Sequence, residues 1–287
     1  IVFRVLDDTA AKGVTPARAP EAIRITEGNG LMTLETGPAG IRLPVGEFTE
    51  KIPAPYQGFK LTPTRWTGGS ALHGTPAPER LFARILERGP LFAEVELAYQ
   101  YPEDRRYTLR CRVIAGESVA LFTESMNTEP GSRYHLNDYE YGKPLNGYPQ
   151  GRYRYTEKFT ASHFVRLTLN DFRPDLQKTH QRFWRSYLGS PHGNTTYPIP
   201  ADPMAEPWIC TLHPWENWQG CDMHAAFEDD TSYLGMIALH PGSWTRSTEN
   251  YPWVRHNQGT VYVDLPINDG KRCWGVHFGP RGSADWA

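Results

Sequence analysis

The sequence lacks the features that mark several common classes of protein. No apolar run is long enough to span a membrane. No block of like charge occurs, because the 30 basic and 32 acidic residues are scattered and leave a formal net charge of −2. This balance argues against an electrostatic surface for nucleic acid or membranes. The phosphate loops GxGxxG and GxxxxGKS/T and the nucleophile elbow GxSxG are absent, which argues against nucleotide-binding and esterase functions.

Cysteines are few, and no two of them form a CxxC pair, which disfavours a zinc ribbon; they are Cys111, Cys210, Cys221 and Cys273. Cys111 lies in an alternating segment and is predicted to be a small buried hydrophobe. Cys210 and Cys221 flank a loop and could form a disulfide in an exported protein. Four cysteines allow three complete pairings, and the sequence does not choose among them.

Amphipathic helices longer than about three turns are also missing, whereas turn-forming and aromatic residues are abundant. The chain has 25 prolines and 26 glycines, which favour short strands joined by long loops. It also has nine tryptophans and fifteen tyrosines. Such residues either fill a large β core or form flat platforms on which sugar rings pack, with their O–H and N–H groups left for hydroxyls. We expect both uses, at different positions.

Period-two alternation of apolar and polar residues predicts an antiparallel meander in the middle of the chain, at 91–99, 107–113 and 119–122. Gly28-Asn29-Gly30 between two alternating segments predicts a hairpin. Further strands are predicted at 41–45, 164–169, 208–212, 236–239, 260–265 and 272–278. Residues 126–160 and 171–207 are interpreted as long functional loops. The predicted organisation is an entry segment, 1–22, and one large antiparallel β-sandwich with long loops, 23–287.

Three segments resemble a known family: 89–95 (GPLFAEV), 107–117 (YTLRCRVIAGE) and 265–275 (LPINDGKRCWG). In this order they resemble the N-terminal, galactose-mutarotase-like β-sandwich (super-sandwich) of large polysaccharide-active proteins, nearest the rhamnogalacturonan exolyase-like group. In that group the sandwich precedes an (α/α) toroid, so the resemblance implies a further helical domain. No toroid is found in this chain, and no catalytic residue is carried over.

A first candidate site lies between Trp208 and His224. His213, Trp215, Glu216 and Trp218 stand within six residues of one another, and His224 follows. Flat apolar surfaces beside imidazole and carboxylate groups are typical of sugar sites. The alternative is a loop whose tryptophans pack on the sandwich. For a hydrolase, which needs two carboxylates, Glu216 and Asp222 are the candidate pair.

A second candidate cluster is Tyr251, Trp253, Arg255 and His256. Arginine binds carboxylates in a bidentate manner, so Arg255 beside His256 would suit a uronate. A lyase needs a group that neutralises the uronate carboxylate and a base that removes the α-proton. We therefore predict His213, His256 and Arg255 as catalytic residues, and Trp215, Glu216, Trp218, His224, Tyr251 and Trp253 as substrate-binding residues. The alternative is an ordinary polar surface loop.

Metal binding has little support. Glu228, Asp229 and Asp230 could hold Ca²⁺ through their carboxylates, although a solvated acidic turn is the alternative. The spacing of His213 and His224 matches no compact zinc motif. No other cofactor is expected.

The chain begins at Ile1 without a signal-like apolar segment, from which we expect processing or a longer parent chain. The function predicted is a β-sandwich module of a secreted or periplasmic, bacterial-type polysaccharide-degrading enzyme, either a lyase or a glycoside hydrolase. Its partner would be an acidic or plant-type polysaccharide or oligosaccharide, with no nucleic-acid or membrane partner. The alternatives are a non-catalytic module that binds glycan or braces a helical domain, and a structural sandwich with no sugar role.

Overall fold

A computed structural model describes residues 22–127, 163–169, 184–190, 193–199, 208–211, 224–228, 231–239, 253–257, 260–267 and 270–280. These residues form twenty β-strands in three antiparallel sheets and contain no helix, as the prediction of an all-β sandwich requires. In that part of the chain no helix is long and apolar enough to cross a membrane.

The A sheet has five strands in the order β1-β2-β3-β5-β6. Their bounds are Arg24–Gly28, Leu31–Glu35, Gly40–Pro44, Gly58–Lys60 and Trp66–Thr67. The C sheet also has five strands, in the order β15-β18-β19-β12-β7. Their bounds are Trp208–Thr211, Trp253–Asn257, Thr260–Pro266, His163–Leu169 and Ser70–Gly74.

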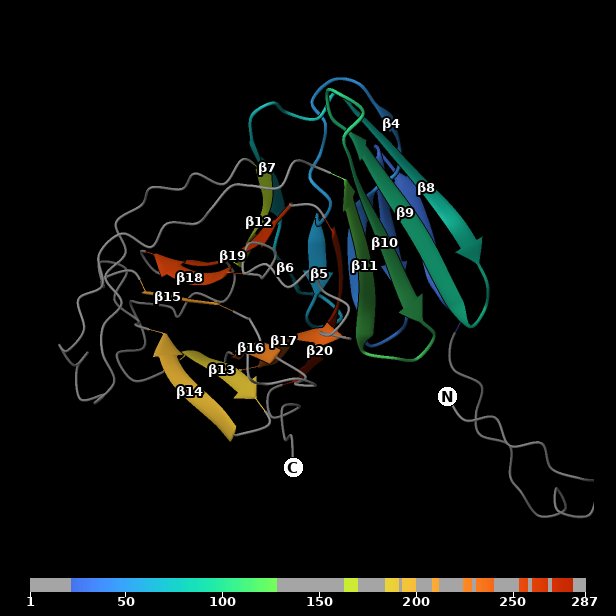
Figure 1. Ribbon diagram of the computed structural model, residues 1–287. Helices are drawn as coiled ribbons and strands as arrows, with labels where there is room; N and C mark the ends of the chain where they lie inside the picture. Colours follow the sequence, from blue (N-terminus) through green and yellow to red (C-terminus); the bar gives the residue numbers. More distant parts are fainter. Residues whose placement is uncertain are drawn as a thin grey trace, which may run out of the picture.

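The B sheet has ten strands in the order β14-β13-β16-β17-β20-β11-β10-β9-β8-β4, and Figure 1 shows it running from β14 at the lower left to β8 and β4 at the right. From β14 to β20 the bounds are Gly193–Ile199, Trp184–Ser190, His224–Glu228, Ser232–Leu239 and Gly270–Pro280. From β11 to β4 they are Val119–Asn127, Arg106–Ile114, Phe92–Gln100, Arg80–Arg88 and Gly46–Phe48.

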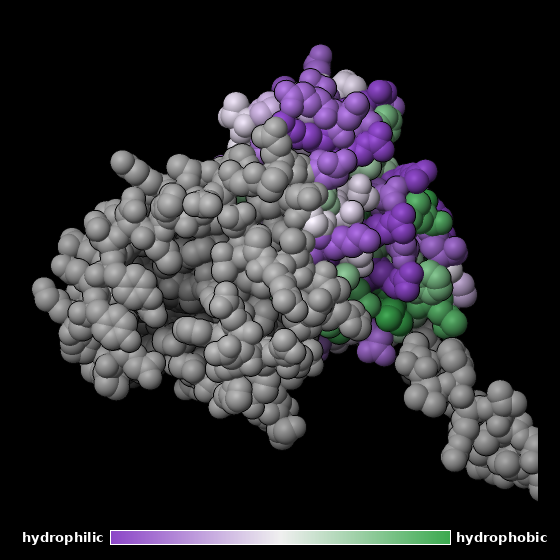
Figure 2. All heavy atoms as spheres, viewed as in Figure 1, coloured by the Kyte–Doolittle hydropathy of each residue, from purple (hydrophilic) through white to green (hydrophobic). Residues whose placement is uncertain are grey.

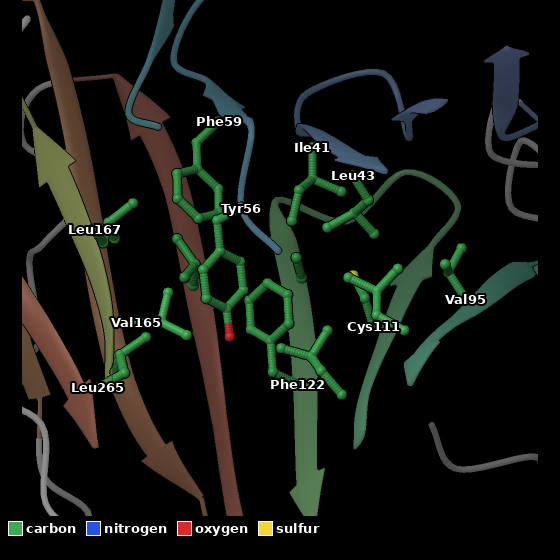
Figure 3. Packing of buried hydrophobic residues seen from close by; sticks show 14 of the residues in the cluster. Ile41, Leu43, Tyr56, Phe59, Val95, Cys111, Phe122, Val165, Leu167 and Leu265 are labelled. Carbon is green, nitrogen blue, oxygen red and sulfur yellow. The ribbon is translucent and has the colours of Figure 1, made fainter. Parts of the chain in front are cut away.

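The inward faces of all three sheets pack into one hydrophobic core. Figure 3 shows Val165 and Leu265 of the C sheet on one side, and Phe122 and Val95 of the B sheet on the other. Tyr56 lies between them, with its ring centroid 5.3 Å from that of Phe122. Side chains of the A sheet, such as Met32, Leu34, Ile41 and Leu43, close the same core. The A and C sheets therefore cover the B sheet as the two halves of one opposing layer.

Two predicted features are confirmed in detail. Asn29 and Gly30 have φ angles of 52° and 72° and join β1 to β2, as the two left-handed residues of a tight hairpin turn do. In the central meander every predicted inward position of β9 and β10 is fully or almost fully buried, including Cys111. Leu91 is the exception: it precedes β9 and is 59% exposed.

The interpretation of residues 171–207 as a long loop is wrong in part. This segment contains β13 and β14, which form a hairpin with Trp184 opposite Ile199 and extend the B sheet to its edge. Strand β8 was not predicted either. A register shift between Ile85 and Glu87 breaks its alternation, so the period-two pattern that identifies a strand is lost there.

The B sheet has a buried charge at its centre, the carboxylate of Glu124 on β11. Its Oε1 accepts hydrogen bonds from the hydroxyls of Tyr107 (2.5 Å) and Tyr56 (3.2 Å). Its Oε2 accepts from the indole N–H of Trp274 (2.9 Å) and from Nε of Arg272. Burial, reinforced by the Glu124 charge, raises the pKa of both tyrosines well above its usual value, so both hydroxyls remain donors.

We predict that Glu124→Gln lowers the free energy of unfolding by about 3–5 kcal/mol, because the fully buried Arg272 loses its counter-charge. Urea unfolding followed by tryptophan fluorescence measures the change. Ser125→Ala, at the neighbouring exposed position of the same strand, is the control and should change the free energy by less than about 0.5 kcal/mol. A loss below about 1 kcal/mol in Glu124→Gln would contradict the assignment.

Candidate functional site

The predicted site residues fall into three groups. His213, Trp215, Glu216, Trp218 and Tyr251 lie outside the described residues. His224 begins β16 of the B sheet, where it pairs with Ile237 and Gly189. Trp253, Arg255 and His256 lie on β18 of the C sheet. The structure therefore gathers three predicted residues on one strand and places His224 in another sheet.

The pairing of β18 with β19 shows which residues lie opposite each position of β18. Trp253 is opposite Asp264 of β19, and Arg255 is opposite Tyr262. Directly paired positions of an antiparallel sheet belong to the same face. Because Val263 and Leu265 lie in the core, Tyr262 and Asp264 belong to the outer face of the sheet, and positions 253 and 255 belong there too. Position 256, opposite Val261, belongs to the inner face.

The outer face of the C sheet is built around an ion pair. Arg166 of β12 donates from Nε to Oδ1 of Asp264 at 2.7 Å and from an Nη to Oδ2 at 3.2 Å. The two residues are directly opposite each other in the β12–β19 register. Asp264 is fully buried and Arg166 is half-buried. Such a two-point contact fixes the plane of the guanidinium group.

Aromatic rings surround this ion pair. The guanidinium carbon of Arg166 lies 5.0 Å from the ring centroid of Phe164 and 5.5 Å from that of Tyr262. His73 of β7 stacks on Phe164, with ring centroids 4.7 Å apart and planes 6° from parallel. We call these residues, together with the positions of Trp253 and Arg255, the C face; its described side chains are His73, Phe164, Arg166, Tyr262 and Asp264.

Alternation explains why these side chains share a face. Val165, Leu167 and Leu169 of β12 fill the core, so Phe164 and Arg166 point outward. The sequence analysis did not identify His73, Phe164, Arg166, Tyr262 or Asp264 as site residues. Asp264 was the available signal, since a carboxylate in the apolar run Val261–Leu265 requires a nearby partner.

The C face combines three kinds of contact that a polar ring-shaped ligand requires. Half-buried aromatic rings, His73 and Tyr262, offer flat surfaces. The Arg166 guanidinium is a fixed donor beside them, held by Asp264. Tyr262 adds a hydroxyl group that donates and accepts. Few convergent polar groups on a largely apolar lining are characteristic of small-molecule sites.

The described residues hold no group of three or more His, Cys, Asp or Glu that could bind a metal ion. Glu228, the first residue of the candidate calcium site, ends β16, and Asp229 and Asp230 lie outside the described residues. Cys111 is a buried thiol in no disulfide, and burial raises its pKa well above the usual value. Cys210 lies on β15, and its predicted partner Cys221 is outside the described residues.

No protein-family model and no curated protein matches the chain. Two solved structures that match it come from Enterococcus faecalis. One is a protein of glycosyl hydrolase family 38, with 11% identity and a TM-score of 0.40, and the other is an α-mannosidase, with 10% identity and a TM-score of 0.41. The alignments cover 90% of this chain and only 30% and 29% of the other two. Neither is described as a rhamnogalacturonan exolyase, so that resemblance remains a prediction.

Asp264→Asn should lower the free energy of unfolding by about 2 kcal/mol, because the fully buried group loses a charge-assisted, two-point contact with Arg166. Urea denaturation of the full chain measures this change. Thr168→Ala, on the same face of β12, is the matched control and should stay within about 0.5 kcal/mol of the parent. Equal unfolding midpoints for Asp264→Asn and the parent would show that the pair does not stabilise the C sheet.

Proposed function

We propose that the protein is the β-sandwich module of a polysaccharide-degrading enzyme and that it contacts its glycan through the C face. One observation carries the proposal: the β18–β19 register places Trp253 and Arg255 on the same face as the Arg166–Asp264 pair and its aromatic neighbours. The positions of Trp253, predicted to bind substrate, and of Arg255, predicted to be catalytic, thus belong to a face with a fixed guanidinium and half-buried rings.

The chemistry of the C face favours an acidic sugar. The axial C–H groups of a sugar ring pack on aromatic faces, and its hydroxyls bond to polar groups at the ring edges. A uronate carboxylate adds a planar, two-oxygen acceptor that a guanidinium matches. Positions 166 and 255 both hold arginine on this face, on strands separated only by β19. The proposed substrate class is therefore an acidic, plant-type polysaccharide.

The proposed reaction is a lytic or hydrolytic cleavage of that polysaccharide outside the cytoplasm. In the lytic form, Arg255 neutralises the uronate carboxylate, and His213 removes the α-proton before the C–O bond to the leaving sugar breaks. His256, the other predicted base, occupies a position on the inner face of β18 and is not assigned to a sugar on the C face. In the hydrolytic form, Glu216 and Asp222 act as the carboxylate pair.

A non-catalytic module that binds glycan is the second candidate, and one observation favours it. Asp264 is the single carboxylate in the five strands of the C sheet, and Arg166 already engages both of its oxygens. Hydrolysis requires a general acid and a second carboxylate, and neither role suits a paired, fully buried group. On the strands alone, the C face therefore has the composition of a binding surface.

A titration of the full chain with a panel of acidic and neutral polysaccharides tests the proposal. Tryptophan fluorescence reports binding, and ultraviolet absorbance of an unsaturated uronate reports lytic cleavage. We expect Trp253→Ala to weaken binding at least about tenfold, the size of effect seen for a central aromatic contact. Trp66→Ala is the control, since Trp66 also pairs with an arginine, Arg42 at 4.0 Å, but on the A sheet.

Product formation with an acidic polysaccharide supports the lyase, and binding without product supports the non-catalytic module. Equal loss of binding in Trp253→Ala and Trp66→Ala, or no response to any polysaccharide, would contradict the C face as the site. Circular dichroism and thermal unfolding of both variants separate a loss of fold from a loss of contact.

A further inference from the structure

The outer face of the B sheet carries a second array of arginines. It lies on a different sheet from β18, which belongs to the C sheet. We call it the arginine face. Its charged and aromatic members, at outward positions of β8, β9 and β10, are Arg80, Phe82, Arg84, Glu87, Phe92, Glu94, Glu96, Arg106, Arg110 and Arg112. Where Figure 1 places these strands, Figure 2 shows hydrophilic residues together with a hydrophobic area at the lower right.

The centre of this face is a carboxylate held between two guanidinium groups. Arg84, Glu96 and Arg110 lie directly across from one another on three adjacent strands. Arg84 donates to Oε1 of Glu96 at 2.8 Å and 3.2 Å, and Arg110 donates to Oε2 at 2.9 Å. Burial of Glu96 opposes its ionisation, but the bonds from both arginines outweigh it and lower its pKa. The carboxylate is therefore a permanent anchor at neutral pH.

The next row is alike on one side only, because Glu94 lies between Arg112 of β10 and the exposed Glu87 of β8. Glu94 accepts a hydrogen bond from Nε of Arg112 at 2.7 Å, and Arg112 also lies over the ring of Phe92, 5.1 Å from its centroid. At the other end of β8, Arg80 pairs with Glu47 of β4 and lies 4.4 Å from the centroid of Phe82. Four guanidinium groups of this face, those of Arg80, Arg84, Arg110 and Arg112, are thus each paired with a carboxylate, and two of them also lie over an aromatic ring.

The charges of this face are arranged in two layers. The side chains of Glu94 and Glu96 are only 14% and 11% exposed, whereas those of Arg84, Arg110 and Arg112 are 68%, 53% and 52% exposed. These three arginines donate through Nε and Nη2, and their Nη1 groups have no acceptor in the described chain. At Glu94 and Glu96 a ligand therefore meets guanidinium donors with these two carboxylates recessed below them, whereas Glu87 and Glu47 are exposed.

We propose that the arginine face binds an acidic polysaccharide through the carboxylates of successive sugars, independently of the C face. Charge complementarity selects this occupant: the exposed layer is cationic, although the chain as a whole has a net charge of −2. Guanidinium groups fixed in advance lose little side-chain entropy on binding. The rings of Phe82 and Phe92 lie beside the arginines and offer apolar contact for sugar C–H groups.

A polymer with one carboxylate per sugar suits this face better than a nucleic acid. Arg84, Arg110 and Arg112 each already engage a recessed carboxylate, so the array is only moderately cationic. Nucleic-acid binding depends on neutralising densely spaced phosphates with cations that have no such partner. Separate, weak, bidentate contacts repeated along a chain are sufficient for a polyuronate, because multivalency multiplies their effect.

Fluorescence anisotropy of a labelled oligogalacturonate, titrated with the full chain, tests this proposal. We expect the double variant Arg84→Gln/Arg110→Gln to bind at least about tenfold more weakly. The control is Arg24→Gln/Arg88→Gln, which removes two arginines that are likewise exposed and ion-paired, but outside the array, and should bind as the parent does. Arg84→Lys/Arg110→Lys keeps the charge but loses the two-point geometry, and should also weaken binding.

Four outcomes would overturn the proposal: equal losses in the Gln variant and its control, unchanged affinity in the Lys variant, equal affinity for a neutral galactan, or tighter binding of duplex DNA. Trp253→Ala keeps the test separate from the C face. If this variant retains its affinity for oligogalacturonate while the Gln variant loses it, the arginine face is an independent site. Thermal unfolding of each variant confirms that the fold is intact.

Discussion

The buried carboxylate of Glu124 is the constraint on which the rest of the sandwich depends. Its four donors come from the segment before β5 and from strands β10 and β20, so one group joins three parts of the chain. Arg272 carries the connection further, since an Nη of it donates to the carbonyl of Pro266 at the end of β19 (3.0 Å). An ionised group is tolerated in a core only when every partner is in place, so these strands can pack in only one relative position.

The geometry of the C face and of the arginine face depends on this core. Asp264 of the C face is two residues before Pro266 on β19, and Arg106 of the arginine face is next to Tyr107 on β10, with Arg110 three residues after Tyr107. In each strand the inward residues fix the register and the outward residues then follow by alternation. A displacement of one residue would exchange the two faces, placing arginines in the core, and the buried network opposes such a displacement.

Alternation also determines how much could be predicted from sequence. The meander β9–β11 and the hairpin at Asn29-Gly30 were predictable because local patterns specify them. The predicted strand 119–122 is shorter than β11, because the inward Glu124 interrupts the apolar series. Strand β8 was not predicted, because a bulge breaks its alternation. Trp253 and Arg255 were identified by residue type, but Arg166 is about 90 residues away from them in the chain and joins β18 and β19 only through strand pairing. Non-local pairing leaves no local signal.

The two faces use carboxylates in the same way, and this limits the chemistry that their strands can supply. Asp264, Glu94 and Glu96 each hold an arginine in position, and the arginines on Glu96 lower its pKa. A general acid at neutral pH needs the opposite, a carboxyl whose pKa is raised by burial away from cations. These three groups therefore hold guanidinium donors in position. In the proposed function those donors face an anionic ligand, and the proton transfer of the lytic form is assigned to His213.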